Sequence, residues 1–211
     1  MSRTTITVCI VSYHYAHLLA QAIESVICQT LKPDRVLVVD DGAHDGVDIV
    51  CKEYPGVEPL IREKNLGRIS NFADILNRVN TDKNVMLGAD NWFHPQALER
   101  MTGEDADIVS TDICLVGEGA ESFGKNVGAV FSDGYWIWKF PAKGDIRKMN
   151  FIHGSSMYNT KIAQRFGYSR GPDEDWELWR DMLLDAGATH KHVPASLLYY
   201  RRHHRNTNQN W

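Results

Sequence analysis

Hydrophobic residues in the first half of the chain follow two alternating patterns. Unbroken runs of β-branched and apolar residues predict strands buried on both faces, and apolar residues spaced three and four apart predict helices. The predicted strands are 5–12, 35–42, 57–63 and 84–91, and the predicted helices are 18–30, 46–54 and 68–79. Regular strand–helix alternation predicts an α/β fold with a mixed, mostly parallel central sheet and flanking crossover helices.

The second half of the chain is less regular. Its predicted strands are 106–116 and 192–202, its predicted helices are 160–167 and 174–187, and a Gly-rich loop is expected over 117–134. The aromatic segment "YWIWKF", residues 135–140, follows that loop. We find no internal repeat and no low-complexity linker, so the sequence predicts a single compact domain.

Composition narrows the classes of protein only modestly. The chain has 211 residues, 43% of them hydrophobic and 24% charged, which is ordinary for a globular protein. The net charge of −4 argues against wholesale binding to nucleic acid or to a membrane surface.

The cysteines and the N-terminus predict a cytoplasmic protein. The four cysteines include no C-x-x-C pair, so we expect buried free thiols in a reducing compartment. The N-terminus runs straight into the first strand, without the pattern of a signal peptide. Since no apolar stretch approaches the ~20 residues that span a bilayer, no transmembrane segment is predicted.

Polar residues follow three of the predicted parallel strands, namely Ser12–His14, Asp40–Asp41 and Asp90–Asn91. Ligands of such sheets bind beyond the carboxyl ends of the strands, so these segments are expected to be neighbours. Asp40 and Asp41 form either a plain turn or a ligand contact, and two consecutive carboxylates favour an acceptor for a base N–H or a ribose hydroxyl. Asp90 is either a turn residue or a ligand for a hard divalent cation.

The acidic run Asp173, Glu174 and Asp175 opens the last predicted helix. Carboxylates in a first turn complement the helix macrodipole, which explains the run without any function. Alternatively, one of these carboxylates is a general base at the edge of the sheet.

The segment "YYRRHHRN" also has two interpretations. It is either an exposed basic tail, or a phosphate site in which Arg201, Arg202 and Arg205 neutralise charge. In the second interpretation His203 or His204 completes a metal shell.

Seven segments, taken in order, resemble the inverting family 2 glycosyltransferases. They are "TVCIVSYHYAHLLAQAIESVICQT", "VLVVDDGAHDG", "EKNLGRISNFADILN", "VMLGADNWFHPQALERM", "FIHGSSMYNTKIAQRFGY", "DEDWELWRDMLLDAG" and "YYRRHHRN". Each motif alone is weak, whereas their order and spacing are specific and cover nearly the whole chain. The resemblance implies a GT-A (Rossmann-like) fold, with residues 1–92 as the nucleotide-sugar half and 93–211 as the acceptor-binding and catalytic half.

The same resemblance implies a reaction. A nucleotide-diphosphate sugar, foremost a UDP-sugar, would bind at the strand ends with a divalent metal, Mn²⁺ or Mg²⁺. A hydroxyl of a saccharide or glycoconjugate would attack the anomeric carbon with inversion, while an enzyme carboxylate removes its proton.

The resemblance also implies a role for individual residues of this chain, according to their positions in the family's motifs. Asp175 would be the general base beside Glu174, Asp90 the metal ligand, and His203 a further metal or diphosphate contact. Asp41 would contact the nucleobase. The donor-binding residues implied by the resemblance are Val11, Ser12, Tyr13, Asp40, Asp41, Arg68, Ala89, Asp90, His153 and Gly154.

The chain departs from the family pattern at Gly88, which stands where the first Asp of Asp-x-Asp is expected. The remaining Asp90 usually coordinates the metal directly, so the departure concerns donor choice more than reaction class. Asn91 is a candidate source of a substitute oxygen.

Three other functions are compatible with parts of the sequence. A non-catalytic binding module would fit the missing Asp, but not the retained acidic positions. A nucleotidyltransferase would need a Gly- and Lys/Arg-rich loop after the first strand, which "SYHYAHLL" lacks. A hydroxymethylated base in DNA is a possible acceptor, with "YWIWKF" stacking and the arginines on phosphates, although the same segment also suits a core strand or a lid under the sugar.

Overall fold

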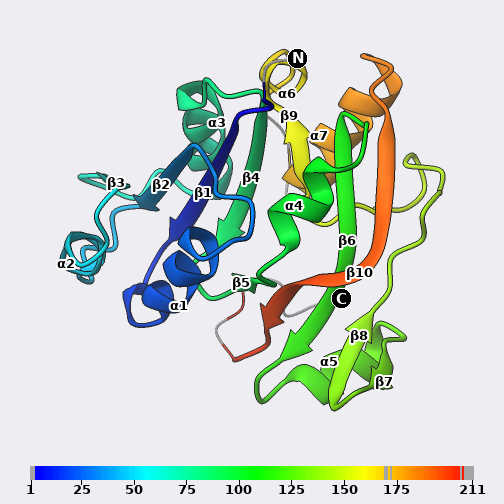
Figure 1. Ribbon diagram of the computed structural model, residues 1–211, viewed down its shortest axis with the longest axis horizontal. Coiled ribbons are helices and arrows are strands. Elements are labelled where there is room, and N and C mark those ends of the chain that lie inside the picture. Colours follow the sequence, from blue (N-terminus) through cyan, green and yellow to red (C-terminus); the bar gives the residue numbers. More distant parts are fainter. Residues whose placement is uncertain (1–2, 169–170, 172, 205, 207–211) are drawn as a thin grey trace.

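The computed structural model describes residues 3–168, 171, 173–204 and 206. A ten-stranded sheet runs through the molecule, with helices on both of its faces (Figure 1). The strands are β1 Ile6–Ser12, β2 Arg35–Asp40, β3 Val57–Ile61, β4 Lys83–Gly88, β5 Trp92–Phe93, β6 Ile108–Val116, β7 Val130–Ser132, β8 Tyr135–Trp138, β9 Met157–Asn159 and β10 His190–Arg201. The helices are α1 Ala16–Ile27, α2 Val47–Lys52, α3 Arg68–Arg78, α4 Ala97–Thr102, α5 Ala120–Asn126, α6 Thr160–Gln164 and α7 Glu174–Leu184.

The strand order is β3-β2-β1-β4-β9-β6-β10-β5, with the β7–β8 hairpin attached to β6. Parallel pairing joins β1 to β2 and β4, β2 to β3, and β6 to β10. The short strands β5, β7, β8 and β9 pair antiparallel. The predicted mixed, mostly parallel α/β sheet is confirmed.

Register brings the polar strand ends together. Ser12 pairs with Asp40, and Val11 pairs with Gly88, so β1, β2 and β4 end at one edge of the sheet. This edge is where a parallel sheet offers its binding crevice.

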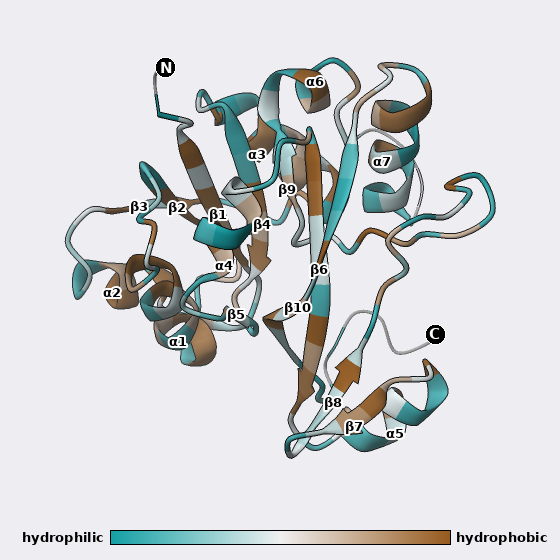
Figure 2. Ribbon diagram, turned by 45° about the vertical axis from the view of Figure 1, so that its right-hand side comes forward, coloured by the Kyte–Doolittle hydropathy of each residue, from teal (hydrophilic) through white to brown (hydrophobic). Residues whose placement is uncertain are grey.

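Two hydrophobic cores lie on opposite faces of the sheet because side chains alternate along each strand. In β1, Val8 and Ile10 pack in the core beneath α1, α2 and α4, whereas Cys9 belongs to the core beneath α3, α6 and α7. In Figure 2 the central strands β1 and β6 carry brown segments, while teal predominates on α4. Burial on both faces explains why the strands read as unbroken apolar runs.

The segment 117–134, expected to be a loop, contains α5 and β7. Helix α5 is stabilised by side chains of β8. Its Phe123 is buried against Trp138, and the indole of Trp136 lies on its Gly124. The helix is too short to show a helical period and contains Gly124, so its stability comes from tertiary packing.

Strands β5 and β9 were also not predicted, because each is too short to show a period, whereas α4 lies in the segment that resembles the family's Asp-x-Asp strand end and the helix after it. The late strand begins at His190 and contains Pro194, where the register against β6 shifts. Proline cannot donate to the ladder and is accommodated at such irregularities.

The four cysteines are free, three of them buried. Over the part of the chain that the structure describes, no helix is long and apolar enough to cross a membrane.

Candidate functional site

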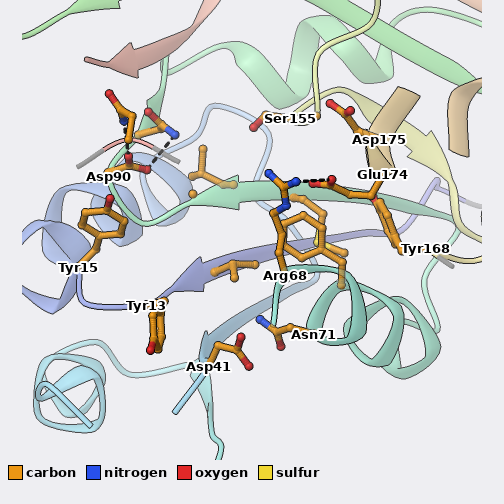
Figure 3. A pocket seen from close by; sticks show the side chains of 18 of the residues that line it. Tyr13, Tyr15, Asp41, Arg68, Asn71, Asp90, Ser155, Tyr168, Glu174 and Asp175 are labelled. Atoms are coloured by element: carbon orange, nitrogen blue, oxygen red, sulfur yellow. Dashed lines mark hydrogen bonds and ion pairs between the residues drawn. The ribbon is translucent and has the colours of Figure 1, made fainter. Parts of the chain in front are cut away.

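A cavity of about 450 Å³ opens at the carboxyl ends of β1, β2 and β4 (Figure 3). The start of α3 and the start of α7 form its walls, and the chain after β10 closes one end. Asp41, Asp90 and Asp175, three of the acidic residues selected from the sequence, all line it.

The two aspartates after β2 have different surroundings. The Asp40 carboxylate accepts the backbone N–H groups of Ala43 (2.8 Å) and His44 (3.0 Å), so it holds the turn and does not line the cavity. Asp41 lines the cavity, and its Oδ1 accepts the N–H of Leu66 at 3.1 Å. The turn interpretation therefore describes Asp40, and Asp41 is the one of the two whose side chain lines the cavity.

Asp41 is fixed by a second set of polar side chains. The partly buried Arg62 lies 3.7 Å from Asp41 Oδ1 and donates to Asn71 Oδ1 at 2.8 Å. Asn71 lines the cavity beside Asp41 (Figure 3). Since Arg62 also pairs with Asp74 at 2.8 Å, the guanidinium ties β3 to α3 behind the cavity.

Residues at the end of β1 contribute an apolar and an aromatic wall. Val11 and Tyr13 line the cavity, and the Tyr13 side chain is 43% exposed. Ser12 is fully buried and does not line it. Ala89 is likewise buried, and its N–H donates to the Val11 carbonyl at 2.9 Å, which ties β4 to β1.

The Asp90 carboxylate meets the chain that follows β10. His203 Nε2 lies 3.2 Å from Asp90 Oδ2, and Asn206 Nδ2 donates to the same oxygen at 3.3 Å. The backbone N–H of His203 donates in turn to Asn206 Oδ1 at 2.7 Å, which orients both side chains. Burial raises the pKa of Asp90 above its usual range, against the opposing hydrogen bond from His203.

Arg201 and Arg202 support the site from outside the cavity. The Arg201 guanidinium lies 4.8 Å from the centre of the Trp92 ring and donates to the Asp90 carbonyl at 3.1 Å. Its backbone N–H donates to Asn91 Oδ1 at 2.9 Å, so that amide oxygen is already engaged. Arg202 stacks on Phe123. Arg205 lies outside the described residues.

Gly88 has a steric role at this turn. A Cβ at this position would come within 2.7 Å of Asp90 Oδ1 and 2.9 Å of Asn91 Nδ2. The Asn91 N–H donates back to the Gly88 carbonyl at 3.0 Å, which folds the turn over the glycine. Any side chain at position 88, including the aspartate of the family pattern, would therefore clash with Asp90 and Asn91 as they fold back over the glycine.

Replacing Gly88 by Ala is expected to displace the Asp90 carboxylate and to weaken any stabilisation by Mn²⁺ about tenfold in affinity. The measurement is the melting temperature with UDP and increasing Mn²⁺. Gly103→Ala is the matched control, because a Cβ there meets nothing closer than 3.5 Å. An unchanged Mn²⁺ titration in Gly88→Ala would contradict this steric account.

Helix α7 is anchored so that its acidic first turn faces the cavity. Trp179 and Met182 are fully buried, and Trp179 packs edge-on against Tyr158. The indole N–H of Trp176 donates to the Ile146 carbonyl at 2.6 Å. These contacts fix both the rotation and the position of the helix.

The two carboxylates of the α7 first turn have different partners. Glu174 is buried and pairs with Arg68, Nη2 to Oε2, at 2.9 Å (Figure 3). Burial raises the pKa of Glu174 to about 7, although Arg68 opposes the shift. The pair joins the first residue of α3 to α7 across the cavity, so Arg68 lines the cavity with its guanidinium already held by a carboxylate.

Asp175 presents an oxygen to the cavity. Its Oδ1 accepts the N–H of Trp176 at 2.7 Å, and a Cβ on Gly154 would lie 3.1 Å from its Oδ2. Gly154 thus leaves the room that this carboxylate occupies. Burial raises the pKa of Asp175 to about 6, near the value that suits a general base at neutral pH.

His153 does not line this cavity, unlike its neighbour Gly154. It is buried on the other side of the chain, where its Nε2 lies 3.2 Å from Thr111 Oγ1 and where it lines a second cavity of about 190 Å³. Burial lowers its pKa to about 3, so its imidazole is neutral.

Several cavity-lining residues were not predicted from the sequence. They are Tyr15, Asn65, Gly67, Asn71, Phe72, Met86, Leu87, Ser155, Tyr168, Tyr200 and Asn206. Five of them lie on α3, β4 and β10, where their spacing indicates only a buried face, and the other six lie in turns and connecting segments. Asn206 follows the His203 motif closely, and that proximity was the one available signal.

With this geometry established, the comparison with known proteins identifies the family. The model of glycosyl transferase family 2 matches residues 7–167, well over half of the chain. The chain therefore belongs to glycosyl transferase family 2, as its motifs predicted. The uncharacterized glycosyltransferase YwdF of Bacillus subtilis strain 168 is 25% identical over 203 residues, covering 92% of this chain and 73% of YwdF.

Solved structures share the fold. TarS of S. aureus, residues 1–349 in complex with UDP, matches with a TM-score of 0.72 at 14% identity, over 94% of this chain. This chain spans 60% of that one. Glucosyl-3-phosphoglycerate synthase of Mycobacterium tuberculosis, in complex with Mn²⁺, UDP and glucosyl-3-phosphoglycerate, matches with a TM-score of 0.67 at 16% identity, covering 95% of this chain and 73% of that one. The predicted GT-A fold is thereby confirmed.

Proposed function

We propose that this protein transfers a sugar from a nucleotide-diphosphate sugar, foremost a UDP-sugar, to an acceptor hydroxyl with inversion. The observation that carries the proposal is the single cavity into which Asp41, Asp90 and Asp175 project from three separate elements. These carboxylates suit a nucleobase, a metal-bound diphosphate and an acceptor proton respectively.

Two ends of the cavity suit two parts of the donor: the end near Asp41 suits the nucleobase, and the end near Asp90 suits the diphosphate. Asp41 accepts a base N–H, while the exposed ring of Tyr13 and the side chain of Val11 flank the base. Two structural neighbours are complexes with UDP and another is a complex with GDP-mannose, which supports a nucleoside-diphosphate donor, foremost a UDP-sugar. Residues 1–92 would then form the nucleotide-sugar half, and 93–211 the acceptor-binding and catalytic half.

Asp90 and His203 would hold a divalent cation. Their facing oxygen and imidazole nitrogen are a donor set that Mn²⁺ accepts, and no group of three or more His, Cys, Asp and Glu side chains suited to a metal occurs among the described residues. Two protein ligands leave coordination positions for phosphate oxygens. When bound, the metal stabilises negative charge on the departing diphosphate. The Mn²⁺ complex of a structural neighbour supports this assignment.

Asp175 is the proposed general base. Its Oδ2 takes the acceptor hydroxyl proton while the acceptor oxygen bonds to the anomeric carbon and the bond from that carbon to the nucleoside diphosphate breaks. Attack from the side opposite the leaving group inverts the anomeric configuration. Glu174, held by Arg68, positions the helix start.

A DNA acceptor gains no support from the fold. Arg201 packs on Trp92 and Arg202 on Phe123, and neither lines the cavity. The acceptor proposed is therefore a saccharide or glycoconjugate. A non-catalytic binding module is the outcome if donor binds but no transfer or donor hydrolysis follows.

A melting-temperature screen of nucleotides with and without Mn²⁺ tests the proposal. UDP is expected to stabilise the chain more than GDP, CMP or ADP, and Mn²⁺ is expected to increase the effect of UDP. A ligand at ~100 times its Kd adds about 2.7 kcal/mol of stability. If no nucleoside diphosphate raises the melting temperature, the proposed donor site is refuted.

A further inference from the structure

A second cavity, of about 190 Å³, adjoins the first. Gly154, Ser155, Asp175 and Tyr200 line both, so the two cavities meet at the carboxylate proposed as the base. The second cavity is smaller than the ~300–1,000 Å³ of pockets for drug-sized ligands, which limits its occupant to roughly the size of one sugar residue.

Aromatic rings dominate the wall of this cavity. Phe123 comes from α5, Trp138 from the end of β8, and Phe140 from the chain that follows β8. The ring centres of Trp138 and Phe140 are 4.6 Å apart, and those of Phe123 and Trp138 are 5.5 Å apart in an edge-on contact. The Phe140 N–H donates to the buried Asp112 carboxylate at 3.0 Å, which fixes this part of the wall.

The cavity has no positive side chain among the described residues that line it. Its titratable members other than Tyr200 are Asp175 and His153, and the pKa of His153, about 3, leaves that imidazole neutral. Arg202 packs behind the wall, 3.9 Å from the centre of the Phe123 ring, and does not line the cavity. An anionic ligand would thus lie beside a carboxylate and meet no lysine or arginine among the described residues of the wall, which opposes its binding.

Resting on the proposed function, we propose that the second cavity is an acceptor subsite for one uncharged pyranose residue, and that it rejects phosphorylated and other anionic acceptors. The apolar C–H face of a pyranose packs on the rings of Trp138 and Phe140, which offer rigid area at little cost in side-chain entropy. One hydroxyl of that residue then reaches Asp175 at the junction of the two cavities.

Saturation-transfer NMR tests the subsite directly, on the free protein and on protein loaded with UDP and Mn²⁺. The probes are methyl glycosides of glucose, galactose and mannose, set against glucose 6-phosphate, 3-phosphoglycerate and methyl glucuronide, at about 10 mM so that millimolar Kd values register. The neutral glycosides are expected to give signal in both states, and the anionic probes at least about tenfold less in the UDP-loaded state.

Two variants test whether the NMR signal of the glycosides comes from the second cavity. Trp138→Ala is expected to weaken binding of the neutral glycoside about tenfold. Phe131→Ala, which removes a 60%-exposed ring from the same hairpin but outside the cavity, is expected to change nothing. UDP-dependent melting temperatures establish that both variants are folded.

Three results would overturn the proposal. They are preferential binding of the phosphorylated probes, absence of signal from every neutral glycoside, and an unchanged signal in folded Trp138→Ala. If Trp138→Ala does not fold, the preference of the wild-type protein for neutral over anionic probes tests the proposal by itself. Since UDP stabilisation is measured separately, failure of the donor site is distinguishable from failure of the subsite.

Discussion

Replacing Asp175 by Asn is expected to reduce sugar transfer by about 10²–10⁴-fold, the contribution usual for a general base. Asparagine keeps the size of the side chain and removes the proton acceptor, so UDP should still stabilise the variant as it does the wild type. The measurements are the release of UDP from the donor sugar in the presence of acceptor, and the UDP-dependent melting temperature. Loss of turnover with retained donor binding identifies Asp175 with the chemical step.

Asp173→Asn is the matched control for that substitution. Asp173 belongs to the same acidic run and precedes α7, yet its side chain makes no capping hydrogen bond and does not line the cavity. The control is expected to retain nearly full activity. Full activity in Asp175→Asn, or an equal loss in Asp173→Asn, would contradict the assignment.

The pH dependence gives a second readout of Asp175. A base must be ionised to accept a proton, and burial raises the pKa of this carboxyl to about 6. Activity is therefore expected to fall as the pH decreases through about 6, since the carboxyl becomes protonated. This decrease at low pH should be absent from the residual activity of Asp175→Asn.

Replacing Asp90 by Asn is expected to abolish the Mn²⁺-dependent part of the stabilisation by UDP. A metal at ~100 times its Kd adds about 2.7 kcal/mol, which corresponds to roughly 5–10 °C in a chain of this size. The amide preserves shape while removing the negative charge that the cation requires. The measurement is the melting temperature in UDP with Mn²⁺ or with a chelator.

His203→Ala tests the second ligand, and His204→Ala is its control. The His203 imidazole lies 3.2 Å from Asp90 Oδ2, whereas His204 is the next residue, exposed and outside the cavity. We expect His203→Ala to weaken the Mn²⁺ effect and His204→Ala to preserve it. Equal Mn²⁺ titrations in wild type, Asp90→Asn and His203→Ala would remove both residues from the metal site.

The first half of the fold could be read from the sequence because its strands are buried on both faces. Such strands appear as unbroken apolar runs, and the helices between them have a clear period. In a parallel sheet the carboxyl ends of the strands meet at one edge, which is why the sequence alone predicts Asp41 and Asp90 to be neighbours. The family motifs added Asp175, whose position in the cavity is consistent with that role.

The second half could not be read in the same way. Strand β9 has three residues, and α5 depends on Phe123 packing beneath the β8 strand. The aromatic wall of the second cavity comes from α5, β8 and the chain that follows β8, so its only signature in the sequence was the dense aromatics of "YWIWKF".

The sequence by itself determined the class of fold and the family, and it selected three carboxylates that line one cavity, because periodicity and motif order are local properties of the chain. Only the tertiary structure showed that Asp41 lines the cavity and Asp40 does not. It assigned Asp40 to a turn and paired Glu174 with Arg68. It also showed that Gly88 leaves room for the Asp90 turn, and it brought His203 to Asp90 across 113 residues. These are contacts between distant segments, and their geometry is set by packing that no local pattern encodes.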